Sequence, residues 1–309
     1  MNKIDPSKIK TYSLKGRTSK VRLDDFAKPH QKYGSYRDFF SSLPNILASK
    51  NLKEVSAAVV QARKDKRPVM LGMGAHSIKV GLSSIIIDLM ERNIITSLSL
   101  NGAGIIHDFE LAFIGQTSED VDREILSGAF GMAEETGRIL NQAINSAAEN
   151  EGIGAAVGRM IQAGDFPYKD KSLLAAGSRL GVPVTVHVAI GTDIIHMHPS
   201  FDGQATGAAA HRDFLAFCSL VSDLEGGVYI NLGSAVLLPE IFLKAVTLCR
   251  NLGNTLQHFT TVNMDFVQHY RPNTNVVCRP TQGGGRGYAI TGHHEIMFPL
   301  LAAAIVEQL

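Results

Sequence analysis

From residue 35 onward, short apolar runs alternate with longer segments whose apolar residues recur at helical spacing. Apolar runs of this length, several of them ending in glycine, are typical of strands buried in a parallel sheet. The predicted strands span residues 68–74, 94–100, 183–189, 227–233, 259–265 and 274–278. The predicted helices lie near residues 39–47, 52–66, 77–92, 119–162 and 294–309. This alternation predicts an α/β fold with a doubly wound, mainly parallel, Rossmann-like sheet.

Residues 1–34 have a different pattern, because they are rich in Lys and Arg and show little periodicity. We expect a basic N-terminal arm that packs on a neighbour or is partly mobile. Aromatic residues are too few and scattered there to stack nucleic-acid bases. Residues 35–309 contain no repeat and no Pro- or Ser-rich linker, so a single Rossmann-like domain is predicted for them.

Composition narrows the classes of partner. The 309 residues are 45% hydrophobic and 19% charged, with a formal net charge of +1. A balance so near zero gives no general attraction to nucleic acid or to an acidic membrane, and it allows copies of the chain to associate. The three cysteines, Cys218, Cys249 and Cys278, do not form a CxxC motif, and no signal segment or membrane span is recognisable. We therefore expect a cytoplasmic protein without disulfides or structural zinc.

Glycines and polar residues follow most of the predicted strands. In open parallel sheets ligands bind beyond the carboxyl ends of the strands, where glycine lets backbone approach a ligand closely. The segments predicted at this edge are 72–77, 101–108, 191–193, 233–234 and the glycine-rich loop 283–287. Gly72, Gly74 and Ser77 match only part of the GxGxxG fingerprint for dinucleotides, and glycine at a strand end is also ordinary turn chemistry.

Six of the eleven histidines fall at or near this predicted edge, namely His76, His107, His196, His198, His293 and His294. The His196-Met-His198 and His293-His294 motifs could bind a metal, but no third ligand or HExxH motif accompanies them. Hydrogen bonding or proton transfer in a polar cleft is the favoured interpretation, and no metal site is predicted.

Acidic residues near the strand ends have two interpretations. Asp108 and Glu110 closely follow the turn at Asn101–Gly104, and His107 lies beside them. A carboxylate there could bind ribose hydroxyls, with the histidine moving protons, or it could simply stabilise the first turn of a helix. Asp193, just after a predicted strand, has the same two possible roles.

Taken in order, these motifs resemble the deoxyhypusine synthase family over roughly residues 35–309. The resemblance runs from Val69–Ser77 through Asn93–Thr96 to the Asn101-Gly-Ala-Gly104 turn. It continues through Pro183–Ile195 and Ile230-Asn-Leu-Gly233 and finishes at Phe298-Pro-Leu-Leu301, which is similar to the Phe-Pro-Leu-Leu of the family.

The resemblance implies a Rossmann-like fold, NAD bound across the strand ends, and a homotetramer with sites at subunit interfaces. Together with Gly74 and Asp108 from the residue patterns, the predicted cofactor-binding residues are Gly74, Ala75, His76, Ser77, Asn101, Gly102, Ala103, Asp108, Asp193, Gly233 and Ser234. The start of the last helix, at His293 and His294, matches a further cofactor contact of the family.

The chain departs from the family where the family's chemistry takes place. Deoxyhypusine synthases form an imine on a lysine late in the chain, whereas the last lysine here is Lys244 and there is no tryptophan. Residues 280–286 replace the loop that carries that lysine. Arg286 stays charged and cannot act as the nucleophile, although it could clamp an anion. Aminobutyl transfer to a protein lysine is therefore not expected.

These observations lead to a hypothesis and two alternatives. The hypothesis is an NAD-binding protein that acts on a small molecule by redox chemistry at a carbon bearing a hydroxyl or an amine, and Arg286 with the glycine-rich turn would suit an anionic substrate. His107, His293 and His294 are the acid–base candidates, and Asp193 is an orienting group. One alternative is a non-catalytic nucleotide-binding or regulatory protein, and the other is a metal-dependent hydrolase that uses the histidines.

Overall fold

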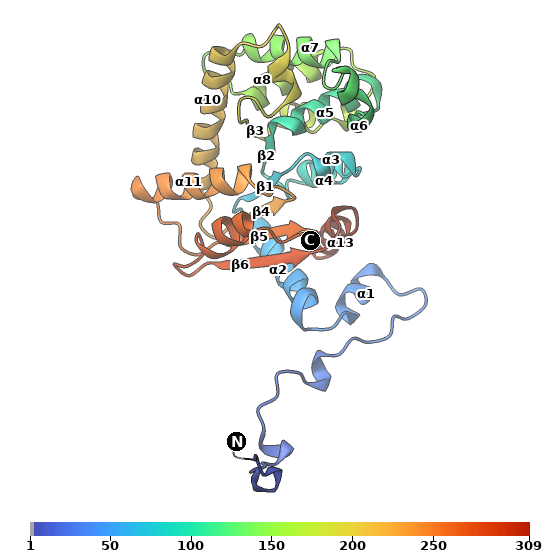
Figure 1. Ribbon diagram of the computed structural model, residues 1–309, viewed down its shortest axis with the longest axis vertical. Helices are drawn as coiled ribbons and strands as arrows, with labels where there is room; N and C mark the ends of the chain where they lie inside the picture. The colour runs from blue at the N-terminus through green and yellow to red at the C-terminus, as the bar shows by residue number, and fades with distance from the viewer. Residues whose placement is uncertain (1–2) are drawn as a thin grey trace.

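The computed structural model describes residues 3–309, and its centre is a sheet of six parallel strands in the order β3-β2-β1-β4-β5-β6 (Figure 1). The strands are β1 (Val69–Met73), β2 (Ser97–Asn101), β3 (Val184–His187), β4 (Val228–Leu232), β5 (Thr260–Asp265) and β6 (Arg286–Thr291). Helices separate the strands along the chain, so the doubly wound, Rossmann-like architecture predicted from the sequence is confirmed.

Both faces of the sheet are covered by helices. Along β1, Val69, Leu71 and Met73 join one apolar cluster, whereas Met70 joins another, where Tyr229 stacks on Phe242. This alternation is the consequence of a strand whose successive side chains point to opposite faces. The helices are α1 (Tyr36–Ser42), α2 (Leu47–Lys64), α3 (His76–Lys79), α4 (Ser83–Glu91), α5 (Gly102–Ile114), α6 (Val121–Glu124), α7 (Glu134–Asn145), α8 (Ile153–Ala163), α9 (Leu173–Leu180), α10 (Gly203–Ser222), α11 (Leu237–Asn251), α12 (Tyr270–Pro272) and α13 (His294–Val306).

Two sequence-based predictions about the C-terminal region are wrong. Residues 273–278 form a π-helical turn instead of a strand. The sixth strand is β6 instead, and the glycine-rich loop 283–287 leads into it. Arg286 pairs with Thr260 at the start of β5, so this loop lies at the amino edge of the sheet, opposite the carboxyl ends. Arg286 therefore does not clamp an anion among the other predicted segments.

The predicted helices are also divided more finely than expected. The segment 77–92 is interrupted at Gly81, where φ is 81°, so that α3 and α4 are separate. Residues 43–46 separate α1 from α2, and the segment 119–162 contains α6, α7, α8 and a 3-10 turn. The short α3 matters for function because it places His76 and Lys79 directly beyond the carboxyl end of β1.

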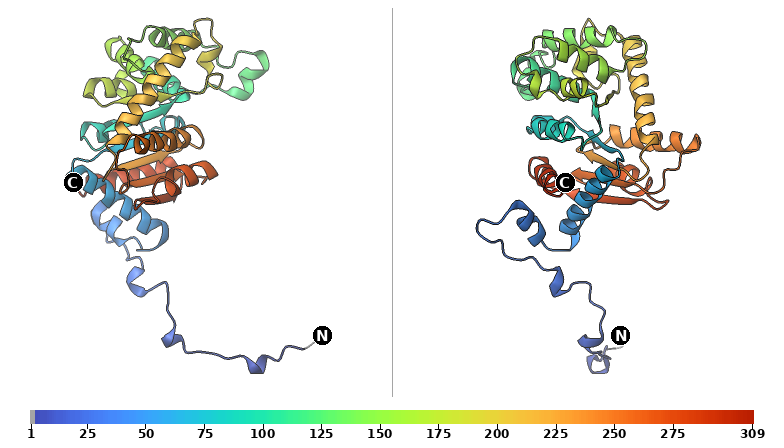
Figure 2. Two further views of the ribbon diagram at one scale, coloured as in Figure 1. Left: turned by 90° about the vertical axis from the view of Figure 1, so that its left-hand side faces the viewer. Right: turned by 180° about the vertical axis from the view of Figure 1, so that it is seen from behind.

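Residues 3–34 form an extended arm with three short 3-10 turns that projects away from the helices and the sheet (Figures 1 and 2). Within this described part of the arm no side chain is buried, and several large apolar side chains, among them Ile4, Tyr12 and Leu23, are exposed. Elsewhere in residues 3–309, as in the arm, no helix is both long enough and apolar enough to cross a membrane.

Candidate active site at the carboxyl edge of the sheet

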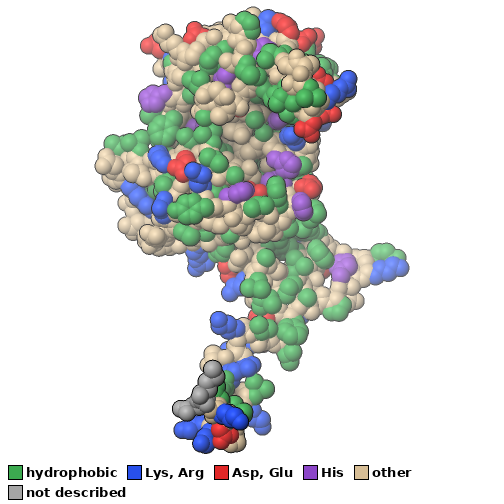
Figure 3. All heavy atoms as spheres, viewed as in Figure 1, with side chains coloured by type: hydrophobic (Ala, Val, Ile, Leu, Met, Phe, Trp, Pro, Cys, Tyr) green, Lys and Arg blue, Asp and Glu red, His purple; other side chains and the backbone are tan. Residues whose placement is uncertain are grey.

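The polar segments that follow the strands meet at the carboxyl edge of the sheet. From β1 the strand order runs outward to β2 and β3, and from β4 it runs outward in the opposite direction to β5 and β6. The connections diverge at such a switch point and leave a crevice in which open parallel sheets bind ligands. Figure 3 shows histidine and acidic side chains gathered on this part of the surface, beside α3 and α13. The edge has two parts, which are described in turn.

The first part, here called the histidine side, comprises residues 74–77, 233–234, 265–266 and 293–294. At its centre, at the switch point, the backbones of Gly74 and Gly233 and the ring of His294 lie close together. Gly233 has φ of 67°, and a Cβ added to it would lie 2.5 Å from Cε1 of His294. A Cβ on Gly74 would collide with the carbonyl oxygen of Gly233. Both glycines are therefore required by the geometry, with Gly74 buried and Gly233 partly exposed.

A buried imidazole and a buried carboxylate lie side by side on the histidine side. Nε2 of His294 is 3.5 Å from Oδ1 of Asp265, and both residues are almost fully buried. Burial raises the pKa of Asp265, but His294 and the backbone N–H groups of Phe266 and Val267 outweigh burial, so this pKa is lowered. Asp265 is thus a fixed negative charge that orients the His294 ring.

Aromatic rings surround this pair. The ring of Phe266, which is 49% exposed, stacks on the ring of His293 at 6.0 Å between centroids. Its centroid also lies 6.0 Å from that of His76, whose pKa is lowered by burial and by the nearby His294. The result is an exposed, flat aromatic surface beside a buried imidazole, and a planar heterocycle could stack there.

Two buried polar atoms on this side lack partners within residues 3–309. They are Oγ of Ser77 and Nδ1 of His294, whereas Nε2 of His294 has only the 3.5 Å contact with Asp265. Ser234, by contrast, is satisfied, because its Oγ accepts from the N–H of Leu238 and its carbonyl accepts from Asn231. Buried polar groups are normally hydrogen-bonded, so the unpaired atoms fit a site that a polar ligand completes.

The second part, here called the carboxylate side, is a pocket of about 260 Å³ beyond β2 and β3. It is lined by Lys79, by residues 103–110 of α5, by the segment 118–130 and by residues 192–194 after β3. Asn101 caps α5, because its side-chain oxygen accepts from the N–H of Gly104 at 3.0 Å. Of the predicted Asn101–Ala103 segment only Ala103 lines the pocket. Helix α3 contacts α5, so the two sides of the edge adjoin.

His107 is held in the pocket by a chain of hydrogen bonds. The hydroxyl of Thr117 donates to Glu110 at 2.5 Å and lies 2.6 Å from Nδ1 of His107, which must then carry the proton. Thr136 donates to the other oxygen of Glu110. Burial, and to a lesser extent the charge of Lys79, lowers the pKa of His107 to about 4, so the ring is neutral near pH 7.

Asp193 lies against the start of α5. A Cβ on Gly102 would collide with its carboxylate, which accepts from the N–H of Ala103 and from the hydroxyl of Thr192. Burial raises the pKa of Asp193. Nδ1 of His196 accepts from the N–H groups of Gly191 and Asp193, so this histidine fixes the loop after β3 instead of facing a ligand.

Asp108 is placed away from the edge, so the cofactor role considered for it is wrong. It is fully buried, and its oxygens accept from the hydroxyl of Ser172 and from the N–H groups of Leu173 and Leu174 at the start of α9. Because all of these bonds are internal, no oxygen is left for a ribose. Burial raises the pKa of Asp108 to about 6. Its role is to fasten α9 to α5.

The histidines do not assemble a metal site among residues 3–309, where no group of three or more His, Cys, Asp or Glu could hold a metal ion. His198 hydrogen-bonds to the carbonyl of Gly131 at 2.8 Å and packs on Gly137. His196 and His198 are therefore structural, and only His76, His293 and His294 gather at the histidine side.

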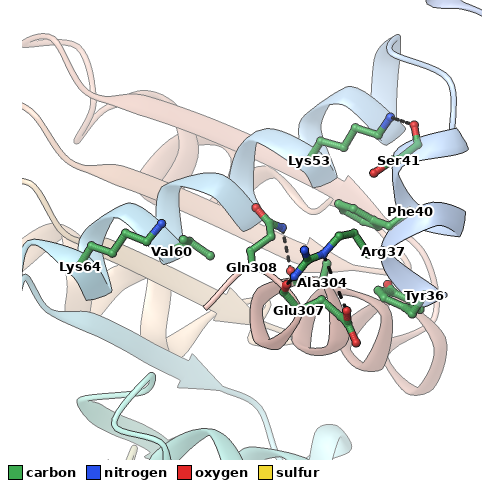
Figure 4. Close-up of a pocket in the computed structure, with 10 residues that line it drawn as sticks. All are labelled: Tyr36, Arg37, Phe40, Ser41, Lys53, Val60, Lys64, Ala304, Glu307 and Gln308. Carbon is green, nitrogen blue, oxygen red and sulfur yellow. Dashed lines mark hydrogen bonds and ion pairs between the residues drawn. The ribbon is translucent and has the colours of Figure 1, made fainter.

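A larger hollow, of about 620 Å³, lies between α1, α2 and α13 (Figure 4). Figure 4 shows Arg37 directed toward Glu307, to whose carbonyl oxygen its guanidinium donates. Tyr36 donates to the carbonyl of Leu300, and Lys53 to that of Leu43. These contacts attach α1 to the body, and no residue of this hollow follows a strand, so it is not part of the edge.

Four residues of the edge, Asp265, Phe266, Lys79 and Glu119, did not stand out as site residues in the sequence. Asp265 ends the predicted strand 259–265 and Phe266 follows it, so the same strand-end rule could have selected them. Glu110 was noticed beside His107, but its place in the pocket depends on Thr117 and Thr136, which no pattern connects to it. Lys79 and Glu119 were not distinguishable from ordinary surface residues.

Comparison with solved structures identifies the fold, whereas comparison of the sequence with family models and curated proteins finds no match. No protein-family model matches the sequence, and no curated protein matches it significantly. A putative deoxyhypusine synthase from Entamoeba histolytica superposes with a TM-score of 0.52 at 11% identity, covering 91% of this chain and 96% of that one. The chain therefore has the fold of deoxyhypusine synthase-like proteins, as the sequence resemblance implied.

Two other solved structures share the fold. A conserved putative LOR/SDH protein from Methanococcus maripaludis S2 has a TM-score of 0.53 at 14% identity, covering 85% of this chain and 70% of that one. AgrE, solved in a ternary complex with ornithine and NAD+, has a TM-score of 0.54 at 15% identity, covering 83% of this chain and 32% of AgrE. The present chain thus spans about a third of the length of AgrE and of the related match ArgZ, an arginine dihydrolase from cyanobacteria.

Proposed function

We propose that the carboxyl edge binds an NAD-type dinucleotide and that the protein acts on a small molecule by NAD-dependent chemistry other than deoxyhypusine synthesis. The observation that carries this proposal is the close approach of Gly74, Gly233 and His294 at the switch point between β1 and β4. This packing requires glycine in the turns after β1 and β4, and glycine turns at such a switch point are the places where dinucleotide-binding folds hold phosphate and ribose.

The surroundings of the switch point suit the other parts of such a cofactor. Ser77 offers a buried hydroxyl with no partner among residues 3–309, and Nδ1 of His294 is in the same condition. Phe266 and His293 present a stacked aromatic surface for a planar ring. Ala75, His76 and Ser234 lie in the same turns, Ala103 lines the neighbouring pocket, and Asn101 and Gly102 precede it at the end of β2 and the start of α5. Asp193 remains in the proposal as the group that fixes the start of α5.

An NAD-type cofactor would supply a hydride acceptor or donor, and the chain supplies proton transfer. Oxidation of a carbon bearing a hydroxyl or an amine releases a proton from oxygen or nitrogen together with the hydride. His294, oriented by Asp265, and the exposed His293 are the proton acceptors beside the switch point. His107, neutral near pH 7, is the acceptor in the adjoining pocket.

The comparisons support a nucleotide and a small substrate in this fold. AgrE has been solved with ornithine and NAD+, and its fold is shared by most of the present chain. Lys244 is the last lysine here, so the imine-forming lysine expected of deoxyhypusine synthases has no counterpart late in the chain. Both observations are explained if this protein has kept the cofactor site of the fold and acts on a different substrate.

Assembly into a homotetramer with sites at subunit interfaces, and a cytoplasmic location, belong to the same proposal. Exposed apolar side chains border the carboxyl edge, which supports burial of this edge against another copy. They are Ile190, Val236, Phe266, Val267, Tyr270 and Ile296. Sedimentation or light scattering of the purified chain would test the oligomer.

The deciding measurement for the proposed function is the melting temperature with and without NAD, NADH and NADP, combined with mass spectrometry of any nucleotide that co-purifies. A ligand that binds only the folded state stabilises it by about 2.7 kcal/mol at one hundred times its dissociation constant. A shift that is selective for one nucleotide is expected. No shift and no co-purified nucleotide would overturn the proposal.

A second candidate is a protein that binds the nucleotide without turning it over. It predicts the same shift but no oxidation or reduction of the nucleotide with any small alcohol or amine. The metal-dependent hydrolase has no support from the geometry, because the described histidines do not converge with other ligands. Metal analysis of the purified chain would show stoichiometric zinc or manganese if that alternative held.

A further inference from the structure

The pocket on the carboxylate side has a charge pattern that the proposed cofactor does not use. Acidic side chains reach it from three separate elements: Glu110 from α5, Glu119 from the segment after α5, and Asp193 from the loop after β3. Glu110 and Asp193 are shielded from solvent, with side chains 15% and 8% exposed. The volume of about 260 Å³ would hold roughly eight or nine waters, and therefore a small molecule of about that many heavy atoms.

The three acidic groups are bound only by neutral donors and neutral rings. Glu110 accepts from Thr117 and Thr136, Glu119 accepts from the N–H of Gly131 at 2.8 Å, and Asp193 accepts from Thr192 and Ala103. In residues 3–309 no Lys or Arg lies within 4.0 Å of any of them. The closest titratable partner of Glu110 is His107, which is neutral near pH 7. Glu110 and Asp193 are partly buried acids without a cation, which is costly, so an ammonium group of a ligand would stabilise them, and the exposed Glu119 could contact the same ligand.

The lining of the pocket also includes one cation, Lys79. Lys79 is exposed, lies on α3 and is not within 4.0 Å of an acidic group in the described part of the chain. Its charge is near enough to lower the pKa of both His107 and His76. An ammonium in this position, facing the crevice, can bind a carboxylate. Apolar residues of the lining include Ile106, Val121 and Ile194.

We propose that this pocket binds a small aliphatic amino acid that carries a second amine. Its carboxylate would contact Lys79, its aliphatic carbons would lie on the apolar lining, and its ammonium groups would contact Glu110, Glu119 and Asp193. The inference deepens the proposed function, on which it rests, by naming the substrate class, because the pocket adjoins the proposed cofactor residues at Ala103 and Asp193. A simple diamine fits less well, since it leaves Lys79 without a partner and places a like charge near it.

Four related probes, each lacking at most one of the charged groups of ornithine, test the proposed contacts one at a time. L-ornithine carries all three charged groups, putrescine lacks the carboxylate, 5-aminopentanoate lacks the α-amine, and norvaline lacks the terminal amine. Isothermal titration of each probe, with and without NAD, is expected to show the tightest binding for ornithine, with each of the other three weaker by about tenfold. Equal binding of ornithine and putrescine, or no binding of ornithine, would overturn the proposal.

Three variants assign the contacts to residues. Lys79→Met is expected to weaken ornithine by about tenfold and to leave putrescine unchanged or slightly stronger, because only the carboxylate contact and a repulsion are removed. Glu119→Gln is expected to weaken ornithine and putrescine alike. Lys64→Met, in the hollow of Figure 4, is the matched control and should change neither. The melting temperature of each unliganded variant establishes that it is folded.

The two proposals fail in different ways. If NAD stabilises the chain but ornithine does not bind, the amino-acid proposal is wrong and the nucleotide proposal stands. If ornithine binds and responds to Lys79→Met but no nucleotide stabilises the chain, the pocket assignment stands and the cofactor proposal is wrong. If Lys79→Met leaves ornithine binding unchanged, the carboxylate contact is not at Lys79 and the assignment is overturned.

Discussion

Two buried aspartates, Asp265 on the histidine side and Asp213 near β3, have different partners, and their pKa values are shifted in opposite directions. On the histidine side, Asp265 lies beside an imidazole and its pKa is lowered. Beneath the carboxylate side, Asp213 accepts from the N–H groups of Gly154 and Val186, and burial raises its pKa to about 7. For Asp213 the backbone N–H groups do not offset the loss of hydration, so its pKa is raised. For Asp265 the His294 ring and two backbone N–H groups do offset it, so its pKa is lowered. The neighbours of Asp265 therefore favour its charged form, whereas burial favours the protonated form of Asp213.

The largest effect is expected from a change that closes the histidine side. Gly233→Ala introduces a Cβ that meets the ring of His294 and forces a left-handed backbone on alanine. We expect the stabilisation by NAD to fall to near zero in a thermal-shift assay. Gly253→Ala is the matched control, because Gly253 also has positive φ, at 90°, but has open space around its Cβ. A full NAD shift in Gly233→Ala would place the nucleotide elsewhere.

The next effect concerns the buried acid beneath the carboxylate side. The folded-state pKa of Asp213 lies above the ordinary value of 3.8, so its contribution to stability is fully present below that value. The contribution is lost as the pH rises toward about 7, with a slope of at most about 1.4 kcal/mol per pH unit. Urea unfolding at pH 4.5 and pH 8 should show this loss, and Asp213→Asn should remove it. Asp24→Asn, in the exposed arm, should leave the loss as it is.

Asp265 should behave with the opposite sign. Its folded-state pKa is depressed, so its contribution is present above the ordinary pKa and is lost as the pH falls below it. We expect Asp265→Asn to reduce the free energy of unfolding at pH 7 by about 1 kcal/mol and to reduce the loss on acidification. An Asp265→Asn chain as stable as the parent at both pH 7 and pH 3.5 would show that the contact with His294 is energetically neutral.

The smallest expected effect tests whether Lys79 belongs to the pocket. Burial is the main reason that the pKa of His107 is about 4, and the charge of Lys79 adds to it. Lys79→Met should therefore raise the pKa of His107 by a few tenths, as expected for one partly screened charge. Imidazole NMR titration of the parent, Lys79→Met and Lys64→Met measures this directly. A pKa of His107 near the ordinary 6.5 in the parent would contradict the buried, relay-bound ring.

The parts of the fold that depend on local pattern were predictable from the sequence. Apolar runs ending in glycine located β1, β4 and the other central strands, and the strand-end rule then collected Gly74, Gly233 and Asp193. The edge strand β6 was missed because its residues alternate in exposure, from exposed Arg286 and Gly287 to buried Tyr288. The glycine-rich loop before it resembled the functional turns, and only the register of β6 with β5 shows which end it occupies.

The site was less predictable, for a physical reason. His107 and Glu110 are near in sequence, but the relay between them passes through Thr117, and the partners of Asp108 are about 64 residues away in the chain. Whether an acid binds a ligand or a helix end depends on such long-range packing. The His293–His294 pair was found from sequence, whereas its partner Asp265 required the pairing of β5 with β6.

Charge is distributed unequally between the N-terminal arm, which is basic, and the rest of the chain, which is net acidic. Residues 3–34 carry nine Lys and Arg against three Asp and Glu, so residues 35–309, with 21 basic and 26 acidic residues, have a net charge of about −5. A nearly neutral protein of this design behaves in dilute salt as a large dipole whose ends attract those of other copies. At physiological ionic strength the screening length is about 8 Å, shorter than the reach of the arm, so this attraction acts only once the arm is in contact. The association of copies through the arm should therefore weaken as the salt concentration rises.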